Sequence, residues 1–308
     1  MSTGPRKRHG ELRWGILFIF PWIVGFLVFV LFPLLFSLYY SFTNYNLIGS
    51  PAWTGIKNYT GLLSDNLFYI SLWNTIYMVI LGLPLHLVGA LIVALMLSAN
   101  VKGLAVYRAI YYLPSVIPLV AAALLWRWIF NPMFGILNAG LSHLGLPQPG
   151  WLIDPVWSKP ALILMGFWGI GGSMVLYLAS IKDMPKELYE VADIDGANWL
   201  QKILRITLPM ISPIIFFNLI TGVIGYFQYF TQAYILSATG YGSQMQVGGP
   251  RDSTMFYALY LYINAFRYFA MGKASAMAWI LFVILMISTL VIFRSSARWV
   301  YYGGETRS

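Results

Sequence analysis

Cysteine is absent from the chain, so it can form neither disulfides nor thiolate metal sites. Charged residues are also scarce: Asp, Glu, Lys and Arg make up only 9% of the 308 residues, against about 25% in ordinary soluble domains. Apolar residues make up 59%. Together these values exclude a disulfide scaffold and indicate a membrane protein with several spans.

Further absences narrow the function. The sequence contains no G-x-x-x-x-G-K-[ST] loop, which would cradle nucleotide phosphates, so we expect no cofactor in this chain. The net charge of +9 comes from Lys and Arg scattered at the ends of apolar runs, so it does not indicate nucleic-acid binding. The histidines, His9, His86 and His143, are too widely spaced to predict a metal site.

Six long apolar runs predict six spanning helices, because a span needs about 20 mostly apolar residues and isolated strands cannot satisfy their backbone in lipid. The fold class is therefore an all-α membrane protein, with a single transmembrane domain over residues 1–308. Only His86 interrupts the second run, and we expect it to make a structural hydrogen bond. The predicted spans are residues 14–42, 67–99, 109–130, 160–181, 207–237 and 274–293.

An even number of spans places both termini on one side of the membrane. That side holds 13 of the 19 Lys and Arg residues, and positively charged segments prefer the cytoplasm. We therefore expect cytoplasmic termini. The first apolar run exceeds the length of a signal-peptide core, so we expect it to remain as a span.

A polar segment, residues 182–205, interrupts the membrane-like sequence on the cytoplasmic side. It holds half of the ten acidic residues of the chain. Such a charge run is most often a solvated loop, but this one is patterned. Pro185 favours the start of a short helix, Asp195-Gly196 favours a turn, and a second amphipathic stretch leads into Leu208-Pro209. Helix, turn and helix at a membrane surface indicate a docking element.

The spacing within this segment resembles the cytoplasmic EAA loop of bacterial ATP-binding-cassette (ABC) importer permeases. Glu190-x-Ala192-x-x-x-Gly196 is followed, after nine intervening residues, by Ile206-x-Leu208-Pro209. Val191 replaces the usual second alanine. Other short elements resemble the maltose-type permeases for sugars and glycerol 3-phosphate: Phe32-Pro33, Gly55-x-x-Asn58-Tyr59, Tyr112-Leu113-Pro114 and Gly248-Gly249-Pro250. An insertion around residues 240–247 departs from that pattern.

The resemblance implies a type I ABC importer permease in the cytoplasmic (inner) membrane of a bacterium, surrounded by lipid. Its partners would be a second homologous permease, two ATPase subunits that bind ATP and Mg²⁺, and an extracytoplasmic solute-binding protein. The chain itself would not be an enzyme. The loop would be a coupling helix seated in the ATPase, with Glu190 as its main polar contact. The coupling residues would be Glu187, Leu188, Glu190, Val191, Ala192, Asp195, Gly196 and Ala197.

Two stretches of the fourth and fifth predicted spans combine aromatic rings with amides and glycines. Sugars present both hydroxyls and apolar C–H faces, so this mixture suits a sugar pathway, and the resemblance places the same stretches at the sugar site of maltose-type relatives. Ordinary helix packing explains such residues equally well. The candidate pathway residues are Trp168, Gly169, Gly172, Gly222, Gly225, Tyr226, Gln228, Tyr229 and Gln232.

Three alternatives remain open at this point. A glycerol 3-phosphate or polyol importer has the same fold, but cationic groups would then be expected in the pathway, and the two stretches have none, which favours a neutral sugar. An ion-coupled secondary carrier would need a buried ionisable group, for which only His86 is available. A membrane enzyme would need paired catalytic side chains in one cavity, and the acids outside residues 182–205 lie near span ends or in loops.

Overall fold

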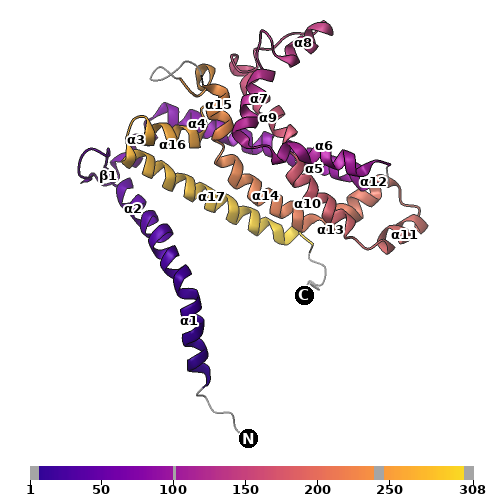
Figure 1. Cartoon of the computed structure of the whole chain (residues 1–308), viewed down its shortest axis with the longest axis horizontal. Helices are drawn as coiled ribbons and strands as arrows, with labels where there is room; N and C mark the ends of the chain where they lie inside the picture. Colours follow the sequence, from indigo (N-terminus) through magenta and orange to yellow (C-terminus); the bar gives the residue numbers. More distant parts are fainter. Residues whose placement is uncertain (1–6, 100–101, 239–245, 302–308) are drawn as a thin grey trace. The chain divides into compact units, whose positions relative to one another are not determined.

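The computed structural model describes residues 7–99, 102–238 and 246–301, which are mostly helical and include one short hairpin (Figure 1). Contacts divide the chain into two units: Met1–Ser64 with Tyr262–Ile280, and Asp65–Leu261 with Leu281–Ser308. The all-α fold class is confirmed. The single domain over residues 1–308 stays a prediction, and most of the insertion at residues 240–247 lies outside the described residues.

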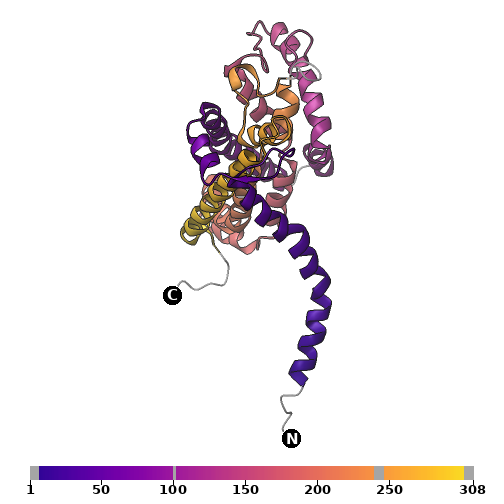
Figure 2. The ribbon, with the colours of Figure 1, turned by 90° about the vertical axis from the view of Figure 1, so that its left-hand side faces the viewer.

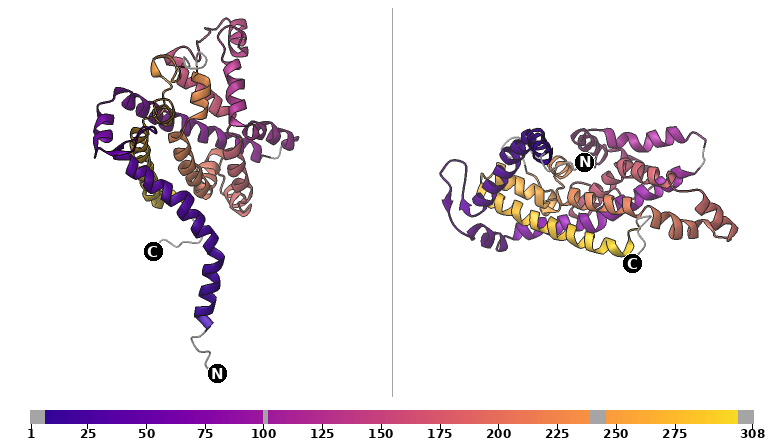
Figure 3. Two further views of the ribbon diagram at one scale, coloured as in Figure 1. Left: turned by 60° about the vertical axis from the view of Figure 1, so that its left-hand side comes forward. Right: turned by 90° about the horizontal axis from the view of Figure 1, so that it is seen from below.

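The first unit begins with a helical rod that Figures 2 and 3 show as continuous and gently curved. The rod and the elements after it are α1 (Lys7–Phe26), η1 (Leu27–Leu31), α2 (Phe32–Ser41), β1 (Thr43–Asn44), β2 (Ala52–Trp53) and α3 (Lys57–Leu63). None of the most apolar 18-residue window within Trp14–Ser41 is buried by the described chain. Lipid or another protein must therefore cover this helix.

The Gly55-x-x-Asn58-Tyr59 element has a structural role in the first unit. The Asn58 amide donates to the carbonyl oxygens of Ser41 and Thr43, at 2.9 Å each, and the Tyr59 hydroxyl donates to Ser41 Oγ at 2.8 Å. The strands β1 and β2 pair antiparallel beside these bonds. The motif therefore fastens α3 to the end of the first span.

The second unit contains most of the helices. Its elements are α4 (Asn66–Tyr77), η2 (Met78–Gly82), α5 (Leu83–Ser98), α6 (Leu104–Val116), α7 (Leu119–Ile129), α8 (Ile136–His143), α9 (Pro155–Trp168), α10 (Gly171–Lys182), α11 (Glu187–Ile194), α12 (Trp199–Lys202), η3 (Ile203–Thr207), α13 (Leu208–Met210), α14 (Ser212–Phe227), α15 (Thr231–Ser237) and η5 (Pro250–Asp252). Two further helices have residues in both units, α16 (Tyr257–Phe266) and α17 (Met271–Trp299).

Three predicted spans are continuous helices of sufficient length and apolarity: Trp14–Ser41, Asn66–Ser98 and Met271–Trp299. The other three predicted spans, residues 109–130, 160–181 and 207–237, are each interrupted by a break in the helix. Three helix pairs are bent at such breaks: α6 and α7 meet at 101°, α9 and α10 at 46°, and the helical segment Trp199–Met210 and α14 at 66°. The described residues thus provide six spans if each bent pair counts as one.

Proline accounts for a recurrent local distortion. Each π-helical segment is followed by a helix whose second residue is proline: η1 by Pro33, η2 by Pro84 and η3 by Pro209. Proline lacks an N–H and its ring clashes with the carbonyl four residues earlier. The turn before it therefore widens, and the N–H of Phe32 bonds Leu27 O, five residues back.

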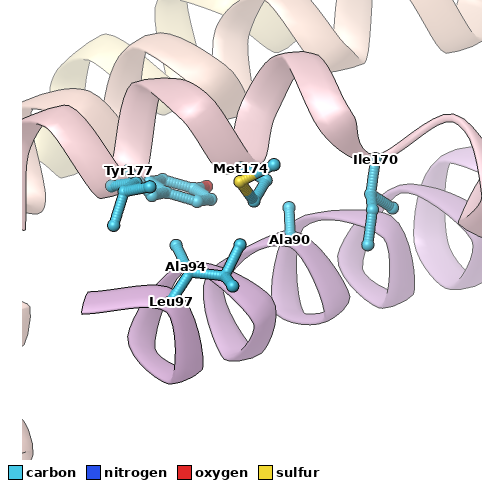
Figure 4. Packing of buried hydrophobic residues seen from close by; sticks show 7 residues of the cluster. Ala90, Ala94, Leu97, Ile170, Met174 and Tyr177 are labelled. Carbon is cyan, nitrogen blue, oxygen red and sulfur yellow. The ribbon is translucent and has the colours of Figure 1, made fainter. Parts of the chain in front are cut away.

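A close helix pair forms the apolar core of the second unit. Small side chains on α5, Ala90 and Ala94, allow α10 to approach, and Met174 and Tyr177 of α10 pack over them (Figure 4). Ala90, Ala94 and Met174 are fully buried. Small residues at the contact are the usual way for membrane helices to pack closely.

Polar side chains tie the helix ends together. Asn74 of α4 donates to the carbonyl oxygens of Asp252 (2.8 Å) and Met255 (3.0 Å), and its own carbonyl oxygen accepts from Lys159 Nζ of α9 at 2.7 Å. Arg127 donates to Ala238 O at 2.8 Å and so caps the carboxyl end of α15. These bonds connect α4 to α9 and α7 to α15.

Candidate functional site

A cavity of about 400 Å³ lies within the second unit, a volume in the range of small-molecule sites. Six elements, α5, α6, α7, α9, α14 and α15, contribute to its wall together with residues between them. Its lining residues are His86, Pro114, Ser115, Ile117, Leu119, Ala122, Leu162, Met165, Gly166, Trp168, Gly169, Gly222, Gly225, Tyr226, Tyr229 and Gln232.

Three helix breaks meet this cavity. Ile117 lies between α6 and α7, Gly169 between α9 and α10, and Tyr229 between α14 and α15, and all three line the cavity. A broken helix leaves backbone N–H and C=O groups without helical partners. At membrane depth such irregular backbone is tolerated where it is buried in protein or lines a cavity. The breaks are therefore typical of a solute-binding region.

The chemistry of the lining is aromatic and uncharged. The ring centroids of Tyr226 and Tyr229 lie 6.0 Å apart, at an interplanar angle of 32°. Trp168 makes an edge-to-face contact with Trp126, with 6.0 Å between the ring centroids. Ser115, His86 and Gln232 add polar groups. Within the described residues no Asp, Glu, Lys or Arg lines the cavity. The site offers ring faces and hydrogen bonds without a fixed charge.

The glycines of α14 have different roles at this wall. A Cβ on Gly222 would lie 2.4 Å from Leu83 Cδ1, so this glycine allows α14 to pack against α5. A Cβ on Gly225 would meet nothing within 4 Å. Gly225 therefore leaves free space at the cavity, whereas Gly222 serves helix packing.

The structure brings most of the predicted pathway residues together. Trp168, Gly169, Gly222, Gly225, Tyr226, Tyr229 and Gln232 line the one cavity. Gly172 and Gln228 are absent from its lining, and Gln228 is an exposed residue at the end of α14. The contributions of α5, α6 and α7 were missed. Pro114 and Pro118 could have suggested the break between α6 and α7, because an interior proline disrupts a helix.

The polar segment 182–205 folds as the predicted helix, turn and helix. The first helix, α11, begins at Glu187, two residues after Pro185. It ends in a Schellman motif: Gly196 N donates to Asp193 O at 3.1 Å and Ala197 N donates to Ala192 O at 2.9 Å. Gly196 has φ of +72°, a left-handed conformation that disfavours residues with a Cβ.

Several bonds brace this loop against the rest of the unit. The Tyr189 hydroxyl lies 2.8 Å from Thr207 Oγ1, which is buried in η3. Asp193 forms an ion pair with Lys202. Asn198 and Gln201 form a capping box that starts α12. Movement of α11 is therefore linked to η3, which leads into α13.

The outer face of α11 is free of contacts from the described chain. Leu188 and Val191 are exposed, at 40% and 57%, and Glu187 and Glu190 are exposed beside them. Ala192, which was predicted as a coupling residue together with them, is only 8% exposed and packs within this chain. An exposed apolar strip next to two carboxylates is suited to contact with another protein.

Comparison with known proteins identifies relatives over nearly the whole length. The family model described as "Binding-protein-dependent transport system inner membrane component" matches residues 86–301. The probable ABC transporter permease protein YesP of Bacillus subtilis is 43% identical over 291 residues, which cover 94% of this chain and 92% of that protein. The arabinooligosaccharides transport system permease protein AraP of Bacillus subtilis is 31% identical over 283 residues, covering 91% and 87%.

A solved structure shares the fold. A chain of the bacterial alginate ABC transporter, crystallised with an alginate pentasaccharide-bound periplasmic protein, superposes with a TM-score of 0.75. Its sequence is 25% identical, and the match covers 94% of this chain and 96% of that chain. All residues that line the cavity and the whole polar segment 182–205 lie within the matched region, residues 86–301.

Proposed function

Because this chain belongs to the binding-protein-dependent transport system inner membrane component family, and is thus a permease subunit of an ABC importer, we propose that it carries a sugar or oligosaccharide. The observation that carries this proposal is the cavity at three helix breaks, lined by Trp168, Tyr226, Tyr229 and Gln232. Aromatic rings can cover the apolar face of a pyranose while amide, hydroxyl and backbone groups bond its hydroxyls. Relatives named for arabinooligosaccharides and alginate support this solute class.

The uncharged lining argues against a phosphate ester. A phosphate group is normally met by Arg or Lys, and among the described residues neither lines the cavity. A glycerol 3-phosphate importer is therefore less favoured. We infer that this chain faces an uncharged part of the sugar, and that a second homologous permease supplies the opposite wall of the pathway.

Transport then proceeds by alternating access of the cavity to the two sides of the membrane, driven by ATPase partners. ATP and Mg²⁺ bind to two ATPase subunits, and α11 docks into them with Glu190 as its charged contact and Leu188 and Val191 as its apolar contacts. The rigid turn at Gly196 and the Tyr189–Thr207 hydrogen bond transmit the motion of α11 to η3 and on towards α14. An extracytoplasmic solute-binding protein delivers the sugar. Both chain termini face the cytoplasm.

The test is purification of the tagged chain from its native membranes in mild detergent, with identification of co-purifying proteins, repeated for Glu190→Ala and for Asp183→Ala. Truncating one partner of a desolvated charged hydrogen bond costs about 2–5 kcal/mol, so Glu190→Ala should release the ATPase or uncouple its hydrolysis from transport. Asp183→Ala is the matched control, because Asp183 is an exposed acid of the same segment that precedes α11.

Recovery of an ATPase and a second permease with the wild type and with Asp183→Ala, but weakened recovery or uncoupled ATPase activity with Glu190→Ala, is the expected result. Equal recovery and normal uptake in Glu190→Ala would exclude the proposed role of α11. Uptake of sugars by the importer in reconstituted membranes tests the solute class separately. Transport of glycerol phosphate without transport of any sugar would overturn the proposed solute class.

A further inference from the structure

His86 is a polar side chain on α5 that lines the cavity. The sequence predicted a structural hydrogen bond for it, and one is present: Nδ1 lies 3.2 Å from the carbonyl oxygen of Gly166 on α9. That bond uses only one of the two ring nitrogens. The second nitrogen, Nε2, is engaged by no hydrogen bond from the described residues.

The carbonyl partner determines the proton on the ring. A carbonyl oxygen can only accept, so the bond requires Nδ1 to carry a hydrogen. In a neutral imidazole the other nitrogen is then a pure acceptor. No Asp or Glu lines the cavity within the described chain, so no carboxylate there favours a second proton on His86. The geometry at Gly166 therefore leaves Nε2 with a lone pair.

The other polar groups of the lining make an acceptor useful. The Ser115 hydroxyl already donates to Tyr112 O at 2.7 Å. The Tyr226 and Tyr229 hydroxyls and the Gln232 amide can all donate hydrogen bonds. A sugar hydroxyl needs to donate as well as accept, and Nε2 of His86 is an acceptor that cannot donate in this tautomer. Nε2 can therefore accept the hydrogen bond that a solute hydroxyl donates.

We propose that His86 contacts the carried solute, with Nε2 accepting a hydrogen bond from one solute hydroxyl while the Nδ1–Gly166 bond holds the ring in place. This inference rests on the proposed function of the cavity as the solute pathway. The consequence is selectivity: a solute that lacks the hydroxyl leaves Nε2 without a partner. Removal of one neutral hydrogen bond corresponds to roughly tenfold weaker recognition.

The first arm of the test needs no solute. Nitrogen NMR of imidazole-labelled protein in lipid nanodiscs distinguishes the two tautomers, and the chain has only three histidines. His86→Asn identifies the His86 signal by its loss. We expect hydrogen on Nδ1 and none on Nε2. A protonated Nε2 in the resting protein would overturn the proposal directly, whatever the solute is.

The second arm uses two variants that each preserve one half of the histidine. His86→Asn places an amide N–H near the position of Nδ1, so it keeps the bond to Gly166 and loses the acceptor. His86→Gln extends an amide oxygen towards the position of Nε2, so it keeps an acceptor and loses the bond to Gly166. The complete importer, reconstituted in proteoliposomes, is assayed for uptake of arabinotriose, maltotriose, lactose and an alginate trisaccharide, and then of monodeoxy derivatives of each probe carried.

The wild type should carry a parent probe about tenfold better than one of its monodeoxy derivatives, His86→Asn should lose that discrimination, and His86→Gln should retain it. The reverse pattern, in which His86→Asn retains the discrimination and His86→Gln loses it, would show that His86 acts only through its bond to Gly166. If the wild type carries none of the four probes, the proposed solute class fails, and the tautomer measurement alone decides the state of Nε2. The two failures are thus distinguishable.

Discussion

Two adjacent glycines at the start of α10 should respond in opposite directions to the same substitution. A Cβ on Gly171 would lie 2.5 Å from the backbone oxygen of Tyr111 and 2.9 Å from the Cα of Tyr112, both on α6. Backbone atoms cannot rotate away, so α6 would have to move by several tenths of an ångström. A Cβ on Gly172 would meet nothing within 4 Å.

The expected magnitudes follow from these contacts. Overpacking of this kind costs about 1–3 kcal/mol, so Gly171→Ala should destabilise the protein by that amount. Gly172→Ala fills open space and gains up to about 1 kcal/mol of helix propensity. Because α6 also carries Pro114 and Ser115 of the cavity wall, Gly171→Ala should also reduce solute uptake.

The assay is thermal and denaturant unfolding of the purified chain in one detergent, with both alanine variants and the wild type measured side by side. A gap of about 1–4 kcal/mol between the two variants is expected. Equal stability of the two, or a more stable Gly171→Ala, would refute the close approach of α6 and α10. Gly172→Ala also serves as a functional control, because Gly172 is outside the cavity lining.

The remaining predictions concern the loop, the polar cross-links and the cavity. Gly196→Val should cost about 1–2 kcal/mol, because the left-handed backbone at this residue opposes a β-branched side chain, and should reduce coupled ATPase activity, whereas Gly196→Asn should be nearly normal in both assays. Tyr189→Phe removes the 2.8 Å bond to Thr207 and should lower the ratio of solute transported to ATP hydrolysed without releasing the ATPase; an unchanged ratio would exclude this bond from the coupling path. Lys159→Met removes a charged partner of Asn74 and should lower unfolding stability by about 1.5–3 kcal/mol, and an unchanged unfolding midpoint would contradict it. Trp168→Ala should abolish most uptake while leaving co-purification with the ATPase intact, and normal uptake would remove this ring from the pathway.

The apolar runs were sufficient to predict the all-helical fold, because a span is long and its composition is extreme. They could not predict the breaks. The run from Ala109 to Phe130 is mostly apolar, with one charged residue, Arg127, near its end, yet it bends by 101° at Ile117-Pro118. Hydropathy reports which segments prefer lipid and not where a helix breaks. Pro114 and Pro118 are the local signals of this break, and the break also depends on backbone satisfaction by neighbouring helices, which the sequence does not display.

The cavity lining was likewise predicted only in part from the sequence. Rings, amides and glycines in the fourth and fifth predicted spans pointed to one wall, and seven of the nine predicted pathway residues lie together. A second wall of the cavity comes from α6, α7 and the break between them, where Ile117, Leu119 and Ala122 are ordinary apolar side chains. Their position at the site follows from the helix breaks and from packing between distant segments, so no local pattern marks them.

The polar segment 182–205 was predictable because its structure is determined by local residues and not by packing between distant segments. Its turn and caps are local, and Asp195-Gly196 and Asn198-x-x-Gln201 specify them within a few residues. Ala192 differs because it is buried by tertiary packing within this chain, although the helical wheel placed it with Leu188 and Val191. Its burial leaves those two residues as the apolar part of the exposed face.

The most direct test of the account is side-specific labelling of the cavity. The chain has no cysteine, and Gly225 has open space where a side chain would be added, so Gly225→Cys supplies a single thiol at the pathway. In the reconstituted importer, a membrane-impermeant thiol reagent should reach it from one side without nucleotide and from the other side with trapped ATP, and a carried sugar should slow both reactions. Reaction from the same side in both states, or no effect of any carried sugar, would contradict alternating access through this cavity.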